Sequence, residues 1–378
     1  MTGHERIEAA FAPGGTPQTP AAICYEDIFI RDHWSELTRY PWWYAESPQM
    51  EEQLAWRREA FAKIGQDWFR LPSFFSREER EDLRIEVRPE GVLRVSRSTG
   101  VAQRLQPPRV GGWRAVGGVE SVHPQQLPQT REEVNALIPE AGELNVEAEL
   151  AAGKADLAHA LLQEFGQLFP ICHVGSPLWL LYTIWGFEGL MTMIGDRPDL
   201  VEYACQCQLA HVLNAVRWAA ALGARGIWIE ECLTDMISPK SFASLNLPLL
   251  QRITAEIREL GMKSIYYYCG NPAGKWELIL SAGADALALE ESKKGFRIEI
   301  EEVVERAGGR CAVLGNLDAI GVLEQGSDEA LRTEIARQIA AGRRNGNRFI
   351  MSTGSPVTPG TPVERVRRYC ELVRELGS

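Results

Sequence analysis

One unit recurs through the second half of this chain: a short apolar run, then one or two polar residues, then a helical pattern. Strands of a parallel sheet that is covered on both faces appear in a sequence as continuous apolar runs, not as alternations. Strand–helix units repeated in this way predict an α/β fold around a parallel sheet. The apolar runs lie at 169–174, 226–229, 263–268, 286–289, 311–314 and 348–351.

Polar side chains follow these runs where each expected strand ends. In a (β/α)8 barrel the carboxyl ends of all strands converge on one face, where the βα loops build the active site. The length of 378 residues suits one such barrel with insertions. We therefore expect a single TIM-barrel domain over 1–378, with a site at this face. The polar residues that follow the runs include Glu230, Glu231, Cys269, Asn271, Glu290, Glu291, Asn316 and Ser352 to Ser355.

The first part of the chain predicts additions to the barrel. The segment 23–34 is expected to be a first strand that continues into a loop facing the site. Alternating apolar and polar residues over 83–104, with turn residues between them, predict a β-hairpin within an insertion of about 83–113. An N-terminal helical cap is expected to hold a tryptophan cluster, which serves either for packing or as a wall over a flat ligand. The cluster comprises Trp34, Trp42, Trp43, Trp56 and Trp68.

Charge and hydropathy narrow the classes of partner. The net charge is −11 and no run of Lys and Arg exceeds a pair, which argues against nucleic acid and anionic membranes as partners. The longest apolar stretch, 178–194, is interrupted by Glu188, and the N-terminus lacks the apolar region of a signal peptide. Eight cysteines without CxxC spacing suit a reducing compartment. These features predict a cytoplasmic protein.

Several short stretches, in this order and spacing, resemble the uroporphyrinogen decarboxylase superfamily. The resemblance covers about 165–376 and implies a (β/α)8 barrel, often as a homodimer. The superfamily also holds methyltransferases that move methyl groups between corrinoids, thiols and methylated donors. The stretches are HVGSPL at 173–178, GFE at 186–188, YCGN at 268–271, GNLD at 315–318 and STGS at 352–355 with Thr361-Pro362 after it.

The N-terminal segment favours the methyltransferase branch of that superfamily. Its decarboxylases hold the carboxylates of a tetrapyrrole with a basic loop after the first strand. Here Glu26, Asp27 and Asp32 make that segment acidic. An acidic segment would repel a highly anionic porphyrinogen.

The resemblance to the zinc methyltransferases argues against a bound zinc ion, because two of the three expected ligands differ. The zinc methyltransferases carry His-x-Cys at one strand end and a second Cys in the Ser-Thr-Gly-Cys stretch. This chain keeps Cys269 but has Tyr267 and Ser355 where the other ligands are expected. One alternative is a zinc site built from Cys269, Glu231 and Glu290. The other is a metal-free site in which Tyr267 and a glutamate transfer protons.

Roles follow for the residues at the strand ends. Because Glu230 and Glu231 are adjacent, only one can face the barrel axis, and Glu231 is the one expected to do so. A histidine such as His173 on an apolar strand is more often a core residue than a catalyst, and Asn316 could instead be a turn residue. The expected catalytic residues are Tyr267, Glu231, Glu290 and Asp235, and the expected substrate-binding residues are His173, Cys269, Asn271, Asn316, Ser355 and Glu26.

Three functions remain open on these grounds. The leading one is transfer of a methyl group between a small methylated substrate and a corrinoid carried by a partner protein. The second is decarboxylation of a tetrapyrrole-like or aromatic acid. The third is a metal-free barrel that binds a ligand without catalysis.

Overall fold

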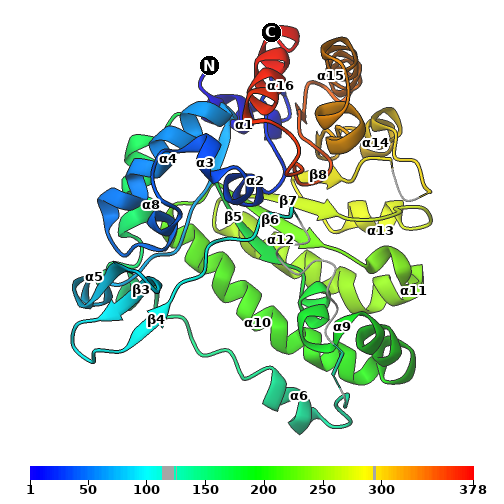
Figure 1. Ribbon diagram of the computed structural model, residues 1–378. Helices are drawn as coiled ribbons and strands as arrows, with labels where there is room; N and C mark the ends of the chain where they lie inside the picture. The colour runs from blue at the N-terminus through cyan, green and yellow to red at the C-terminus, as the bar shows by residue number, and fades with distance from the viewer. Residues whose placement is uncertain (113–122, 125, 293–294) are drawn as a thin grey trace.

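A computed structural model describes residues 1–112, 123–124, 126–292 and 295–378. Its centre is a parallel sheet in the order β1-β5-β6-β7-β8-β9-β10 (Figure 1). The register aligns Glu230 of β6 with Tyr267 of β7. The strands are β1 (Trp68–Arg70), β5 (Phe169–Gly175), β6 (Gly226–Glu231), β7 (Lys263–Tyr268), β8 (Ala286–Leu289), β9 (Ala312–Leu314) and β10 (Phe349–Ile350). The six strands expected from the apolar runs are confirmed.

The segment 20–22 closes this sheet into a barrel. Ala21 forms a parallel bridge with Met351, just after β10. On its other side the Ala21 carbonyl accepts the N–H of Asp67, just before β1, at 2.8 Å. The segment therefore occupies the eighth strand position, between β10 and β1. The expected (β/α)8 barrel is confirmed. The expectation of a first strand within 23–34 is wrong, because the pairing segment lies just before it and α2 (Glu26–Asp32) occupies most of that range.

Helices cover the outer face of the sheet (Figure 1). Ser238 and Ser327 are helix caps, because their side chains accept the N–H of Ser241 and Ala330. A π-helical turn, η4, separates α11 from α12. The helices and helical turns that follow α9 (Pro177–Asp196) along the chain are α10 (Pro198–Leu222), η3 (Thr234–Met236), α11 (Pro239–Ser241), η4 (Phe242–Asn246), α12 (Leu247–Glu259), α13 (Trp276–Ser281), α14 (Ile300–Ala307), η5 (Ala319–Glu324), α15 (Asp328–Arg343) and α16 (Val363–Leu376).

The barrel interior is apolar and is closed at its amino-terminal end by α1 (Gly3–Phe11). Ile7, Ala10 and Phe11 of this helix share a buried cluster with Trp68 and Phe169 from the strands. Trp68 therefore belongs to the barrel interior and not to the N-terminal cap where it was expected. The reason is that Trp68 lies on β1, a strand of three residues that is too short to be predicted from an apolar run.

The expected cap and hairpin are both present beside the barrel (Figure 1). The cap consists of α2, α3 (Trp34–Leu37), η1 (Trp42–Glu46) and α4 (Met50–Ile64). The hairpin is an antiparallel sheet of β2 (Leu83–Arg88), β3 (Gly91–Ser96) and β4 (Ala102–Arg104). Residue 113, the end of the expected insertion, lies outside the described residues. The helices α5 (Arg77–Asp82), α6 (Arg131–Leu137), α7 (Val146–Ala151) and α8 (Asp156–Glu164) complete the crossover to β5.

One helix of the described chain, α9 (Pro177–Asp196), has the length and apolar composition of a membrane span. Gly186 within it has φ 65° and ψ −178°, so the helix is kinked there. Leu181, Trp185 and Leu190 of α9 are buried in the same cluster as Leu200 and Leu209 of α10. Because core helices also satisfy such a test, α9 is weak evidence for a membrane.

A glycine on α15 tests how tightly the helical layer packs on the sheet. A methyl group at Gly342 would lie 2.2 Å from Phe349 Cγ on β10, whereas one at Gly195 on α9 has no described atom within 4 Å. We expect Gly342→Ala to lower the free energy of unfolding by about 1–3 kcal/mol through overpacking. Gly195→Ala should be neutral or stabilising, by up to about 1 kcal/mol. Urea denaturation of both variants measures this, and equal effects would contradict the packing argument.

Candidate active site

An aromatic layer forms the floor of the site inside the barrel mouth. Trp228 stacks on Tyr267 with ring centroids 4.9 Å apart and on His173 at 5.9 Å. Tyr25 lies edge-on to all three rings. It reaches this place from a left-handed backbone conformation, φ 55°, directly before α2. Burial holds the pKa of His173 well below its usual range, so the imidazole is neutral.

Glu230 is the carboxyl group that faces this layer. Burial raises its pKa to about 7, although a hydrogen bond with Tyr25 opposes the rise. Asp27 and Arg70 act on the same carboxyl through their charges. Its Oε1 atom is buried and has no hydrogen-bond partner among the described residues. Glu230 is therefore a carboxylic acid that is half protonated near neutral pH and holds one oxygen unengaged.

Glu231, in contrast, faces the helical layer outside the barrel, and the expectation that it faces the axis is wrong. Its Oε1 accepts the Ser176 hydroxyl at 2.8 Å and its Oε2 accepts the Asn246 amide at 2.5 Å. Burial raises the pKa of Glu231 to about 8. Adjacent strand residues alternate between faces, and only the register with β7 shows which glutamate shares a face with Tyr267.

Tyr267 faces the site as a wall residue. Its hydroxyl donates a hydrogen bond of 2.9 Å to the Gly354 carbonyl, and burial raises its pKa well above the usual range. A phenol that is already donating and reluctant to ionise is poorly suited to proton transfer. The structure thus favours an orienting role for Tyr267 over the expected catalytic one.

Cys269 lies beside a second thiol that the sequence analysis did not select. Cys232 and Cys269 follow β6 and β7 at matching positions, and the Cys269 N–H donates to the Glu231 carbonyl at 2.8 Å. A hydrogen bond between the two thiols, together with burial, raises the pKa of Cys232 well above its usual range. At neutral pH Cys232 is therefore a thiol and not a thiolate.

The alternative zinc site of Cys269, Glu231 and Glu290 is not assembled. The Glu231 carboxylate lies on the other face of β6, held by Ser176 and Asn246. Among the described residues, no three side chains of His, Cys, Asp or Glu converge as metal ligands. The donor set present thus does not fit zinc, because a zinc site takes three or four such ligands.

The glutamates after β8 differ in their surroundings. Glu291 is buried and its Oε2 accepts the Ser355 hydroxyl at 2.8 Å. This bond ties the loop after β10 to the loop after β8, so Ser355 acts there as a structural link. Glu290 is buried as well, and its charge acts on Tyr267. Glu290 thus lies within electrostatic range of Tyr267, and its catalytic role stays a prediction.

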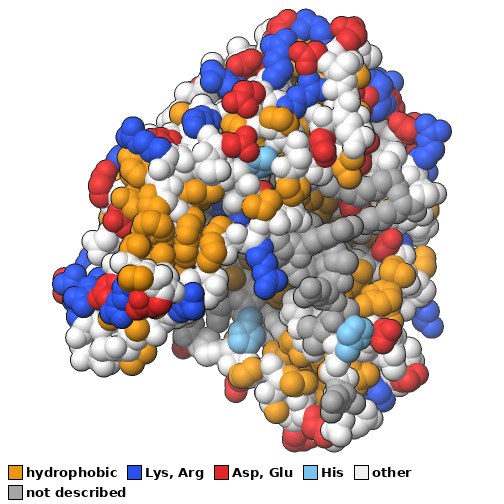
Figure 2. Space-filling model, in the orientation of Figure 1, with side chains coloured by type: hydrophobic (Ala, Val, Ile, Leu, Met, Phe, Trp, Pro, Cys, Tyr) orange, Lys and Arg blue, Asp and Glu red, His pale blue; other side chains and the backbone are white. Residues whose placement is uncertain are grey.

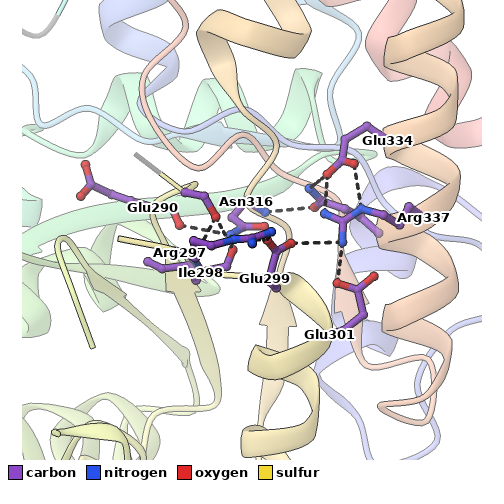
Figure 3. Close-up of polar contacts among 10 residues, drawn as sticks. Glu290, Arg297, Ile298, Glu299, Glu301, Asn316, Glu334 and Arg337 are labelled. Atoms are coloured by element: carbon purple, nitrogen blue, oxygen red, sulfur yellow. Dashed lines mark hydrogen bonds and ion pairs between the residues drawn. The ribbon is translucent and has the colours of Figure 1, made fainter. Parts of the chain in front are cut away.

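Asn316 anchors the loop between β8 and α14. Its amide donates to the carbonyls of Glu290 at 3.1 Å and Ile298 at 2.9 Å. Its own N–H donates to the side chain of Gln338 at 3.1 Å. Figure 3 shows Asn316 at the centre of this network, next to the cluster of Arg337 with its glutamates. These bonds fit neither a turn residue nor a free substrate ligand, because they use the Asn316 amide to tie together distant segments of the chain.

Asp235 and Asn271 form a hydrogen bond between the loops that follow β6 and β7. The Asn271 N–H donates to Asp235 Oδ2 at 3.2 Å, and the Asn271 side chain accepts the N–H of Ala273. Gly270 permits this approach, because a methyl group there would lie 2.4 Å from the Asp235 carboxyl carbon. The pair shapes the loop after β7.

Glu26 lines a cavity of about 590 Å³ beside the mouth. Its carboxyl accepts the Arg70 N–H at 2.6 Å and the side-chain amide of Gln66, and burial raises its pKa to about 8. The cavity lies among α2, α3, η1, α4 and the end of β1. The tryptophans Trp34, Trp42 and Trp56 line it, as the hypothesis of an aromatic wall requires. Figure 2 shows hydrophobic side chains gathered between the hairpin and the cap helices.

A closed parallel barrel with titratable side chains at the carboxyl ends of its strands defines the class of (β/α)8-barrel proteins. The family model described as uroporphyrinogen decarboxylase (URO-D) matches residues 124–376. Since this is more than half of the chain, the protein belongs to the uroporphyrinogen decarboxylase family.

Individual relatives agree with this assignment. A uroporphyrinogen decarboxylase of Crocosphaera subtropica is 26% identical over 326 residues, covering 81% of this chain and 86% of the relative. The chloroplastic uroporphyrinogen decarboxylase 2 of Oryza sativa subsp. japonica is 25% identical over 208 residues, covering 53% of this chain and 51% of the relative. Among solved structures, a methyltransferase from Methanosarcina mazei matches over 100% of both chains with a TM-score of 0.65 and 17% identity, which shows the shared fold.

The buried glutamates predict how stability depends on pH. Glu231 keeps its proton in the folded state up to about pH 8, whereas in the unfolded chain it loses it near pH 4.3. Between these values the folded state binds more protons, so stability falls as pH rises, by at most about 1.4 kcal/mol per pH unit for one group. We expect Glu231→Gln, which carries no charge at any pH, to flatten the decline of the melting temperature between pH 5 and pH 8. Parallel melting curves for variant and wild type would contradict this.

Proposed function

We propose that this protein is an enzyme that removes a methyl group from a small methylated substrate and passes it to a corrinoid carried by a partner protein. The observation that carries the proposal is Glu230, a barrel-facing acid with a pKa of about 7 and an unengaged buried oxygen. An acid with a pKa near the working pH is suited to protonate a departing atom.

Each residue of the barrel mouth has a separate role in the proposed reaction. The reduced corrinoid would supply the nucleophile that takes the methyl group. Glu230 donates its proton to the oxygen, nitrogen or sulfur that the methyl group leaves. Tyr25 fixes the Glu230 carboxyl through their hydrogen bond, and the rings of Trp228 and Tyr267 exclude water below it.

The charges of the mouth favour a small substrate over a tetrapyrrole with many carboxylates. Arg70 is paired with Asp27 at 2.7 Å, and Arg31 with Asp32 at 2.8 Å. Paired arginines offer little to further carboxylates. The segment 26–32 was expected to present free negative charge. Nearby arginines neutralise this charge instead.

A matched pair of substitutions tests the role of Glu230. The assay follows methylation of free cob(I)alamin by absorbance, with methyl ethers, methylamines and methyl thioethers as donors. We expect Glu230→Gln to lower the rate about 10²- to 10⁴-fold, because the acid is lost. Glu231→Gln, on the opposite face of the same strand, should lower it far less. Equal losses in both variants would contradict the assignment of the acid.

The pH profile supplies an independent check. Because Glu230 acts in its protonated form, the wild-type rate should be constant below about pH 7 and fall above it. The residual rate of Glu230→Gln should lack this decline. A wild-type rate that rises through pH 7 would show instead that the group acts as a base.

A decarboxylase is the second candidate, and Glu230 also supports it. A protonated acid beside a stacked aromatic floor can deliver a proton to the carbon that loses carbon dioxide. Family membership and the similarity to uroporphyrinogen decarboxylases support this alternative. Two results together would establish a decarboxylase. The wild type would release carbon dioxide from uroporphyrinogen or an aromatic acid without methylating cob(I)alamin, and Glu230→Gln would not release it.

The proposed partners follow from the leading function. We propose that a corrinoid protein docks over the barrel mouth, and that the enzyme works in the cytoplasm, where a homodimer is the expected state. Nucleic acid and membrane are not proposed as partners. Co-elution of the chain with a corrinoid protein from the same organism tests the first point.

A further inference from the structure

The cavity beside the mouth contains an arginine that forms no ion pair with any described residue. Arg57 on α4 is 9% exposed and lines the cavity. Its Nη1 donates to the carbonyl and side-chain oxygens of Gln53 at 2.9 and 2.5 Å, and its guanidinium carbon lies 4.1 Å from the centre of the Trp56 ring. Over the described ranges, its Nε and Nη2 make no hydrogen bond and it forms no ion pair.

The other charges of the cavity are already matched. Asp27 pairs with Arg70, and Arg31 with Asp32. Glu46 lies 3.7 Å from Arg94. The cavity carboxyl whose charge acts on Arg57 is that of Glu26. Among the described residues Glu26 forms no ion pair with Arg57, because its oxygens accept the Arg70 N–H and the side-chain amide of Gln66, and burial raises its pKa.

Burial lowers the pKa of Arg57 to about 9, so the side chain is still charged at neutral pH. A buried charge without a partner is costly, and the cost falls when an anion binds beside it. Two free N–H groups of one guanidinium fit the two oxygens of a carboxylate. The cavity is therefore suited to a monovalent organic anion.

The walls define the rest of such a ligand. The rings of Trp34 and Trp56 have centroids 5.0 Å apart, and Trp42 and Phe61 line the same cavity. Flat aromatic walls favour a flat aromatic ligand through stacking. A volume of about 590 Å³ suits a small molecule.

We propose that this cavity binds a planar aromatic monocarboxylate, with its carboxylate on Arg57 and its ring against Trp34 and Trp42. The inference rests on the proposed function in one respect, because it makes the methylated substrate an aromatic acid. Arg70 connects the two regions, since it lines the cavity and its charge acts on Glu230. The proposal places the substituent of the ring on the Arg70 side of the cavity, toward Glu230.

Isothermal titration with benzoate and 4-methoxybenzoate tests the cavity without any cofactor. We expect both to bind the wild type, and Arg57→Met to weaken them at least about tenfold through loss of charged hydrogen bonds. The matched control is Arg58→Gln, because Arg58 is exposed and pairs with Glu164 and Glu51 outside the cavity. It should bind like the wild type. Methoxybenzyl alcohol, which lacks the charge, should bind wild type and Arg57→Met alike and weakly.

A second variant tests the proposal independently, in case Arg57→Met fails to fold. Trp42 lies half-buried in η1, and Trp42→Ala should weaken benzoate at least about tenfold while leaving the weaker binding of acetate unchanged. No binding of benzoate to the wild type, equal binding to Arg57→Met, or tighter binding of inorganic phosphate than of benzoate would overturn the proposal. If benzoates bind through Arg57 but 4-methoxybenzoate does not methylate cob(I)alamin, the methyl-transfer function fails and the binding site stands.

Discussion

The barrel depends on Asp67, a buried residue that joins both ends of the chain to the closing strand. Its Oδ2 accepts the Ala21 N–H at 2.7 Å, and its own N–H donates to the Ala21 carbonyl at 2.8 Å. Its Oδ1 is paired with Arg6 of α1 at 2.5 Å and lies 3.4 Å from Arg374 of α16. The segment 20–22 is too short to be held by a long ladder of hydrogen bonds. Without this carboxylate the buried N–H of Ala21 would lose its partner, a loss of about 1–3 kcal/mol.

Closure at Asp67 in turn places the site. The chain leaves the closing segment at Cys24 and turns at Tyr25, whose left-handed backbone conformation is uncommon for a residue with a side chain. The turn sends Tyr25 into the barrel, toward His173 and Trp228, and starts α2 with Glu26. One short segment thus supplies the partner of Glu230 and one wall of the adjoining cavity. Strain of this kind is often retained where function needs a particular geometry.

Much of the fold could be predicted because β5 to β10 are continuous apolar runs between well-capped helices. β1 and the closing segment escaped prediction because each has about three residues and their pairing is made by distant parts of the chain. In the site, the catalytic roles expected for Glu290 and Tyr267 stay predictions, whereas Glu231 was preferred to Glu230 because the order of residues alone does not show which face of β6 is inward. Arg57 gave no signal, since it stands next to Arg58 in a charged helix. Only packing shows that Arg57 is buried with no ion pair in the described part of the chain, whereas Arg58 is paired at the surface.

The alternation of Glu230 and Glu231 makes β6 sensitive to changes in length. In a strand, loss or gain of one residue before the pair would exchange the two faces. The acid would then lie among the helices, and the residue that bonds Ser176 and Asn246 would enter the mouth. Substitutions along β6 can be absorbed one at a time, but a deletion would invert the strand's whole inner and outer surface. Relatives that keep this chemistry are therefore expected to vary β6 in composition while holding its length constant.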